Sequence, residues 1–160
     1  TDLTGAWGIA LGRPVTTSYQ RWIAQFVDSG DLADPTKEAT LWGELADPDR
    51  DGDPNLLEYA LDTPPLDGRR DPGALQGLLV SESGKRRFRV VFRMRDDPGL
   101  SFVVESSREL TPTGWQVGRF NEVPPRSDDP AHPDYQWVTV ETAPLADSDN
   151  ALFARLRVLR

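Results

Sequence analysis

The chain has 160 residues, of which 28% are charged and 38% hydrophobic, with a formal net charge of −8. This balance excludes a fully disordered polymer and is typical of one folded domain, or of a small domain with an appendage. The absence of cysteine excludes disulfides, thiolate metal sites and thiol nucleophiles. We expect no membrane span, because no apolar run is long enough. The chain begins with Thr1 and shows no signal peptide, so we expect a processed or excised piece of something longer.

The acidity belongs to the first half of the chain. Residues 1–80 carry 14 acidic and 6 basic residues, whereas residues 81–160 carry 12 of each. An acidic chain without a basic cluster is a poor partner for duplex nucleic acid, so we expect no nucleic-acid partner.

Residues 1–17 are expected to form an irregular lead-in, and residues 18–65 a short helical segment. The spacing of apolar residues predicts a helix that begins at Thr17 or Ser18 and ends at Gly30. A second short helical turn is expected within "DPTKEATLWGEL", residues 34–45, with Leu41, Trp42 and Leu45 as its apolar residues. The stretch "PNLLEYAL" predicts a further helix with Asp53 as its N-cap and Pro54 as its first residue.

Residues 75–160 are expected to form an antiparallel β-sandwich, which makes the fold class α+β. The stretch "RRFRVVFRMR" alternates apolar and arginine residues, the pattern of a half-buried strand. "GLLVSES" is expected to pair with it across Ser83–Gly84. Further strands are predicted at "LSFVVES", "GWQVGRF", "YQWVTVET" and "ALFARLRVL", and a long proline-rich loop at "NEVPPRSDDPAHPD".

The stretch "ADPDRDGDPNLLEYAL" at residues 46–61 has the spacing of an EF-hand-like calcium loop. Such a loop uses ligand positions 1, 3, 5, 7 (through the backbone carbonyl), 9 and 12, with glycine at position 6. Gly52 falls on the glycine position. The predicted metal ligands are, in order, Asp47, Asp49, Asp51, Asp53, Asn55 and Glu58.

Calcium is the expected cofactor, because all six predicted ligands offer hard oxygen atoms and no histidine or cysteine lies nearby. The alternative is an acidic, solvated loop that binds nothing. Position 8 of the loop is Pro54, which has no backbone N–H to donate to a paired EF-hand loop. The chain contains no second loop of this type. We therefore expect a lone structural site rather than half of a paired sensor.

The loop and the strands together carry a resemblance to a known kind of module. "ADPDRDGDPNLLEYAL" after "YQRWIAQF" resembles the "aDpDgDGlsNllEYAlg" segment of C-terminal modules on large secreted proteins of Verrucomicrobia and related bacteria. It is also similar to thrombospondin type 3 and dockerin calcium loops. "FRVVFRMRDDPGLSFVVESSREL" and "LFARLRV" resemble strands of the same modules, so the resemblance spans nearly all of residues 18–159. It implies an extracellular or cell-surface, non-catalytic terminal module.

Catalytic alternatives are weaker. His132 is the only histidine, and no G-x-S-x-G nucleophile elbow accompanies it, so a loop histidine is favoured over a Ser-His-Asp triad. The pairs Asp96–Asp97 and Asp128–Asp129 are better explained by turns than by glycosidase chemistry. We expect no catalytic residues and no enzymatic activity.

Glycan binding is the alternative function. Exposed tryptophans stack on sugar rings, and a row of arginines can bind acidic polysaccharide. The arginines of "RRFRVVFRMR" form such a row, and Arg155 and Arg157 would extend it if the last predicted strand lay beside this one. The other explanation is a solvated strand face whose arginines pair with acidic residues such as Glu105 or Glu141. The candidate glycan-binding residues are Trp115, Trp137, Arg87, Arg89, Arg93 and Arg95.

Taken together, the sequence predicts a non-enzymatic, calcium-stabilised accessory module of a larger secreted or surface protein, acting as a cap, attachment or adhesion unit. The alternative is a carbohydrate-binding module that targets an enzyme to polysaccharide. The expected partners are calcium and a polysaccharide or cell-surface component.

Overall fold

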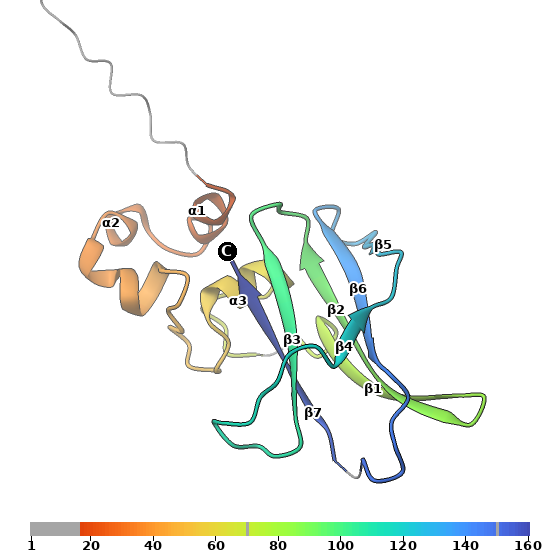
Figure 1. The fold of residues 1–160 in the computed structure, drawn as a ribbon. Helices are drawn as coiled ribbons and strands as arrows, with labels where there is room; N and C mark the ends of the chain where they lie inside the picture. The colour runs from red at the N-terminus through yellow and green to blue at the C-terminus, as the bar shows by residue number, and fades with distance from the viewer. Residues whose placement is uncertain (1–16, 70, 150) are drawn as a thin grey trace, which may run out of the picture.

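The computed structural model describes residues 17–69, 71–149 and 151–160. Nearly all of the expected lead-in, including Trp7, lies outside these residues. Short helices gather on one side of the chain and two antiparallel sheets on the other, with α3 between them (Figure 1). The helices are α1 (Ser18–Ile23), α2 (Ser29–Leu32), the 3₁₀ turn η1 (Pro35–Lys37), the π-helical turn η2 (Glu38–Trp42) and α3 (Asn55–Leu61). None of the described helices is long and apolar enough to cross a bilayer.

Helix α1 begins as predicted and ends early. The N–H of Gln20 donates to the Thr17 hydroxyl at 3.1 Å, and the Thr17 N–H donates to the Gln20 side chain at 2.9 Å, which forms a capping box. After Ile23 the N–H of Phe26 bonds three residues back, to Ile23, so the chain tightens and leaves the helix. Gly30 lies inside α2, so the prediction that it ends the first helix was wrong.

Helix α3 starts one residue later than predicted. Pro54 has extended backbone angles and precedes the helix, so Asp53 is not the N-cap. The first two helical N–H groups find partners in the preceding segment: Asn55 donates to the Ala46 carbonyl at 2.8 Å and Leu56 to the Glu44 carbonyl at 2.9 Å. These bonds satisfy donors that a helix start leaves open, and they tie α3 to the chain that enters the acidic loop.

The β part consists of a five-stranded and a two-stranded sheet. The predicted hairpin is confirmed, since Glu82 pairs with Lys85 and both turn residues have positive φ, 51° at Ser83 and 75° at Gly84. "GWQVGRF" contributes only a bridge between Ser106 and Gln116 and the start of β4, so a full strand there was wrong. The larger sheet has β1 (Leu75–Glu82), β2 (Lys85–Arg95), β6 (Tyr135–Thr142) and β4 (Phe120–Glu122) in that order, with β5 (Ser127–Asp128) also on β6; the smaller has β3 (Ser101–Ser107) and β7 (Phe153–Leu159).

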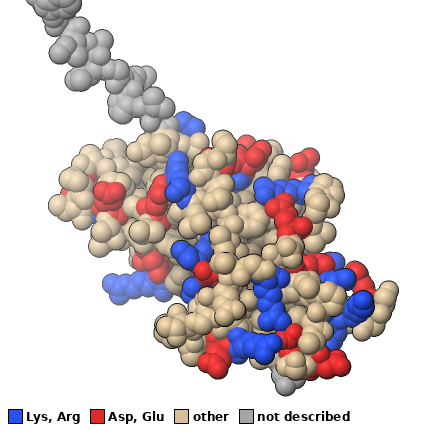
Figure 2. Space-filling view, in the orientation of Figure 1, with Lys and Arg blue, Asp and Glu red and all other residues tan. Residues whose placement is uncertain are grey.

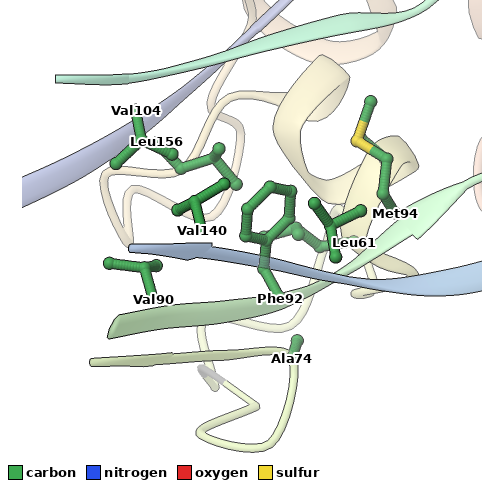
Figure 3. Packing of buried hydrophobic residues seen from close by; sticks show 10 residues of the cluster. Leu61, Ala74, Val90, Phe92, Met94, Val104, Val140 and Leu156 are labelled. Carbon is green, nitrogen blue, oxygen red and sulfur yellow. The ribbon is translucent and has the colours of Figure 1, made fainter. Parts of the chain in front are cut away.

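One hydrophobic core joins both sheets to α3. Val104 and Leu156 of the smaller sheet point toward Phe92 and Val140 of the larger one, with Leu61 of α3 beside them (Figure 3). The Phe92 ring meets the Phe102 ring edge-on at a centroid distance of 5.0 Å. The predicted α+β class with an antiparallel β part is confirmed. The sandwich itself stays a prediction.

A second cluster lies between α1 and α3. The fully buried Tyr59 ring has its centroid 5.5 Å from both the Tyr19 and the Trp22 rings. Its hydroxyl donates to Asp97, in the connection between β2 and β3, at 2.7 Å. Helix α3 therefore contributes to both cores and links the helical part to the sheets.

Candidate metal centre

The acidic loop folds around its own carboxylates. Asp47 accepts a hydrogen bond from the Gly52 N–H at 3.1 Å, Asp49 from the Asp51 N–H at 3.3 Å, and Asp51 from the Asp53 N–H at 2.8 Å. Gly52 has a φ of 96°, a conformation that favours glycine and lets the chain reverse at this point. The loop thus directs successive carboxylates inward instead of spreading them into solvent.

Three aspartates converge. One carboxylate oxygen from each of Asp47, Asp49 and Asp51 lies within 4.8 Å of the other two. Like charges this close repel one another. Glu58 is not part of this group of three, although it comes from the adjoining turn of α3.

The decisive feature is a set of buried oxygen atoms without partners. Among the described residues, only four buried side-chain polar atoms lack a hydrogen-bond partner, and all four are oxygens of predicted ligands. A buried acceptor without a partner typically costs about 1–3 kcal/mol, so four in one place need a common explanation. The four atoms are Asp47 Oδ1, Asp49 Oδ2, Asn55 Oδ1 and Glu58 Oε2.

Asn55 has a fixed orientation. Its side-chain amide nitrogen donates to the carbonyls of Leu41 and Gly43, both at 3.0 Å, and the residue is 0% exposed. Two carbonyl acceptors require the NH₂ group on that side, so the amide oxygen must be the atom that has no partner. Asn55 therefore holds the η2 segment with one end and offers an oxygen with the other, a double role that the loop spacing did not predict.

Glu58 is buried among like charges. It is 2% exposed, and burial raises its pKa to about 9, with repulsion from the nearby aspartates, Asp49 first, adding to the shift. Burial also raises the pKa of Asp49. A cation at this position would offset both shifts, because it supplies the opposite charge that the described residues do not place beside Glu58.

The residues present fit a hard divalent cation. The donor set is entirely oxygen, and position 7 of the loop pattern uses the Asp53 carbonyl rather than its side chain. Carboxylate, carbonyl and amide oxygens suit Ca²⁺ or Mg²⁺ and do not suit metals that select sulfur or imidazole. Chemically, the arrangement can bind an ion and hold α3.

Two arginines of β2 hold the other end of α3, which sequence reasoning missed. Arg95 donates to the Tyr59 carbonyl at 3.1 Å, and Arg93 donates to the Leu61 carbonyl at 2.9 Å. Arg93 is 5% exposed and also pairs with Asp71 and Asp129. Alternation placed these arginines on the strand face opposite the apolar core, but nothing local in the sequence signals that helix carbonyls meet them there.

The arginine row does not form one open cationic face. Strands β2 and β7 belong to different sheets, so Arg155 and Arg157 do not extend the row on β2. Basic and acidic side chains are interspersed on the face seen in Figure 2. Each predicted arginine has an acidic partner: Glu82 for Arg87, Glu82 and Glu141 for Arg89, Asp71 and Asp129 for Arg93, and Asp62 for Arg95.

The two candidate tryptophans lie apart. Trp115 follows β3, where its indole N–H donates to the Thr111 carbonyl at 2.9 Å and the Arg155 guanidinium lies 4.5 Å from its ring. Trp137 belongs to β6 of the other sheet and lies opposite Arg93. The structure does not bring them into one aromatic strip. Glycan binding stays a prediction, which a glycan array with Trp115→Ala and Trp137→Ala variants tests.

Glu105 is the centre of a separate ion-pair cluster on the smaller sheet. Arg155 and Arg157 donate to its two carboxylate oxygens at 2.5 and 3.1 Å, and the hydrogen bond from Arg155 does most to lower its pKa.

Because folding lowers the pKa of Glu105, its carboxylate stabilises the fold at pH values above the pKa of a glutamate in the unfolded chain. This contribution is lost as the pH falls through the pKa that Glu105 has in the folded chain. We expect Glu105→Gln to flatten the decline in melting temperature from about pH 5 to about pH 3. The control is Glu109→Gln, at an exposed position, whose decline in melting temperature should match the parent's. Equal declines in the Glu105→Gln and Glu109→Gln variants would contradict the role assigned to Glu105.

His132 lies in the loop before β6, as favoured from the sequence. Its ring contacts the Asp129 carboxylate at 3.1 Å and the Arg93 guanidinium at 2.8 Å. Both partners belong to the network that holds the end of α3.

No protein-family model, curated protein or solved structure matches this chain. The resemblance to C-terminal modules of secreted bacterial proteins therefore stays a prediction.

Proposed function

We propose that residues 47–58 bind one Ca²⁺ and that this ion fixes α3, and with it the helical part, to the sheets. The observation that carries the proposal is the set of four buried oxygens without partners, all of which belong to predicted ligands. Loop spacing and the burial of partnerless oxygens are independent of one another, and all four residues that the second criterion selects are among the six that the first selects.

The proposed ligands are the carboxylates of Asp47, Asp49, Asp51 and Glu58, the Asp53 carbonyl and the Asn55 amide oxygen, the last directly or through a water. When bound, the ion supplies the positive charge that clustered carboxylates need. A large number of flexible oxygen ligands favours Ca²⁺ over Mg²⁺, which demands a tighter octahedron and keeps more of its water.

The consequence for the fold follows from the contacts of α3. Its first turn carries Asn55 and Glu58, whereas its last residues pack in the core and accept hydrogen bonds from Arg93 and Arg95. Without a cation, repulsion loosens the loop and the first turn while the far end stays held. The metal centre therefore secures the first turn of α3, at the opposite end from the carbonyls that Arg93 and Arg95 hold.

We propose further that the chain is a non-enzymatic, extracellular accessory module of a larger secreted or surface protein, in which a two-layer β-sandwich serves as cap, attachment or adhesion unit. Support comes from the resemblance stated above and from the oxygen-only site, which suits the calcium concentrations that extracellular modules use.

A calorimetric titration of the chelator-treated chain tests the calcium proposal. We expect one Ca²⁺ per chain, with a dissociation constant of roughly 10⁻⁴–10⁻³ M or lower, and binding of Mg²⁺ that is weaker by about tenfold or more. Ionic selectivity is the control, because an acidic patch that merely attracts counterions treats the two ions alike. Absence of saturable Ca²⁺ binding, or equal binding of both ions, would refute the proposal.

A further inference from the structure

Strand β1 has an open edge. It pairs with β2 over its whole length, from Leu75 opposite Phe92 to Glu82 opposite Lys85, without a bulge. Within residues 17–69, 71–149 and 151–160, no strand pairs with its other side. The β1–β2 hairpin also reaches out from the body of the chain, away from α3 (Figure 1). An open edge of this kind presents unpaired N–H and C=O groups to another strand.

The side chains of β1 do not protect this edge. Natural edge strands are usually protected by lysine, proline, bulges or inward-pointing charges. Between Leu75 and Ser81, β1 contains no charge and no proline. Leu78 is 43% exposed and Leu79 is 62% exposed, one on each face of the sheet.

The hydrogen bonds between β1 and β2 determine which backbone groups of β1 face the open edge. The Arg93 N–H donates to the Ala74 carbonyl at 2.9 Å, so Ala74, just before β1, points its backbone toward β2. In an antiparallel ladder this direction alternates from residue to residue. The N–H and C=O groups of Leu75, Gly77, Leu79 and Ser81 therefore face the open edge.

We propose that β1 pairs antiparallel with β1 of a second copy, with Leu79 opposite Leu79 on a two-fold axis perpendicular to the sheet. Leu78 then lies opposite Val80, Gly77 opposite Ser81, and Gln76 opposite Glu82. Apolar side chains meet apolar ones, and the one carboxylate meets an amide. The outward-facing residues exchange backbone hydrogen bonds, and two five-stranded sheets become one.

Neighbouring registers fit less well. With Leu78 opposite Leu78, Val80 would lie opposite Gln76 and Leu79 opposite Gly77. With Val80 on the axis, Leu78 would lie opposite Glu82. Of the three registers centred on Leu78, Leu79 and Val80, the one centred on Leu79 is therefore the most complementary, and this self-complementarity favours a second copy over an unrelated strand. Such an isologous contact uses up the open edge on both copies and closes at a dimer.

Sedimentation of the calcium-loaded chain tests the dimer over a roughly hundredfold range of concentration, since mass action separates a weak dimer from a monomer. Leu79→Lys places two ammonium groups opposite each other on the axis and should weaken association by about tenfold or more. The matched control is Leu110→Lys, because Leu110 is 72% exposed and lies outside every strand. Both side chains are exposed, so neither change should disturb folding.

A single introduced thiol tests the register, because the chain has no cysteine of its own. Opposed residues that exchange hydrogen bonds have Cα atoms about 5.5 Å apart, within the range for a disulfide. Leu79→Cys should therefore crosslink on oxidation. In the proposed register, Gln76→Cys places the two thiols about 20 Å apart along the strands and should not crosslink. A monomer at every concentration, growth beyond a dimer, association insensitive to Leu79→Lys, or equal crosslinking of the two cysteine variants would each overturn the proposal.

Discussion

The Glu58→Gln variant is expected to be more stable than the parent in chelator and less stable than the parent in calcium. In chelator near neutral pH, burial raises the pKa of Glu58 to about 9, so the parent must take up a proton at this carboxyl when it folds, whereas glutamine has nearly the same shape, avoids this cost and can donate to the neighbouring carboxylates. The gain is on the order of 1–3 kcal/mol, the usual cost of a buried polar group without a partner.

In calcium the order reverses, because the variant lacks the carboxylate that closes the site. At a free ion concentration of about 100 times the dissociation constant, binding stabilises the parent by about 2.7 kcal/mol. For a chain of this length, that gain corresponds to a rise in melting temperature of roughly 5–10 °C. The variant should show little of this rise.

Thermal melts of both chains, with calcium and with chelator, provide the measurement. The control is Glu122→Gln, which makes the same chemical change on β4, where the carboxylate pairs with Arg126 at the surface. That variant should follow the parent in both conditions. A calcium response of Glu58→Gln equal to the parent's would contradict the assigned role of Glu58.

Replacing Tyr59 should have the largest effect on stability. Tyr59→Ala removes a fully buried ring of α3 that packs against α1 on one side. On the side of β2, the Arg95 guanidinium lies 4.4 Å from the ring centroid. Deleting such a ring typically costs about 3–5 kcal/mol, equivalent here to a fall in melting temperature of roughly 6 °C or more. The helical part would lose the ring against which Tyr19 and Trp22 of α1 pack.

Tyr59→Phe is the matched control, because it keeps the ring and removes only the hydroxyl group, which donates to Asp97. Its cost should be about 1 kcal/mol. Denaturant unfolding of the two variants in calcium separates the two contributions. If alanine were no more destabilising than phenylalanine, α3 would not be the link between the two parts.

Local signals in the sequence were sufficient for much of this architecture. The alternation of "RRFRVVFRMR" and the two-residue turn at Ser83–Gly84 located the β1–β2 hairpin, because register and turn geometry are short-range properties. The loop spacing likewise located the three aspartates that converge. Both depend on residues that are neighbours in the chain.

The features that the sequence left open or missed involve contacts between distant segments. Which strands share a sheet is decided by packing across the whole chain, so the separation of β2 from β7 could not be seen in either strand alone. The same holds for the amide of Asn55 on the Leu41 and Gly43 carbonyls, and for Arg93 on the end of α3. Burial of Glu58 is also a tertiary property, and it is this burial that turns an acidic loop into a candidate metal centre.

A crystal structure of the chain grown in calcium tests the central claim most directly. We expect a single anomalous scatterer within about 2.3–2.6 Å of oxygens from Asp47, Asp49, Asp51, the Asp53 carbonyl and Glu58, with Asn55 direct or through a water. The four oxygens that now lack partners would then all lie in or beside the coordination sphere. Calcium bound elsewhere on the chain, or a loop that stays without an ion at saturating calcium, would contradict the account.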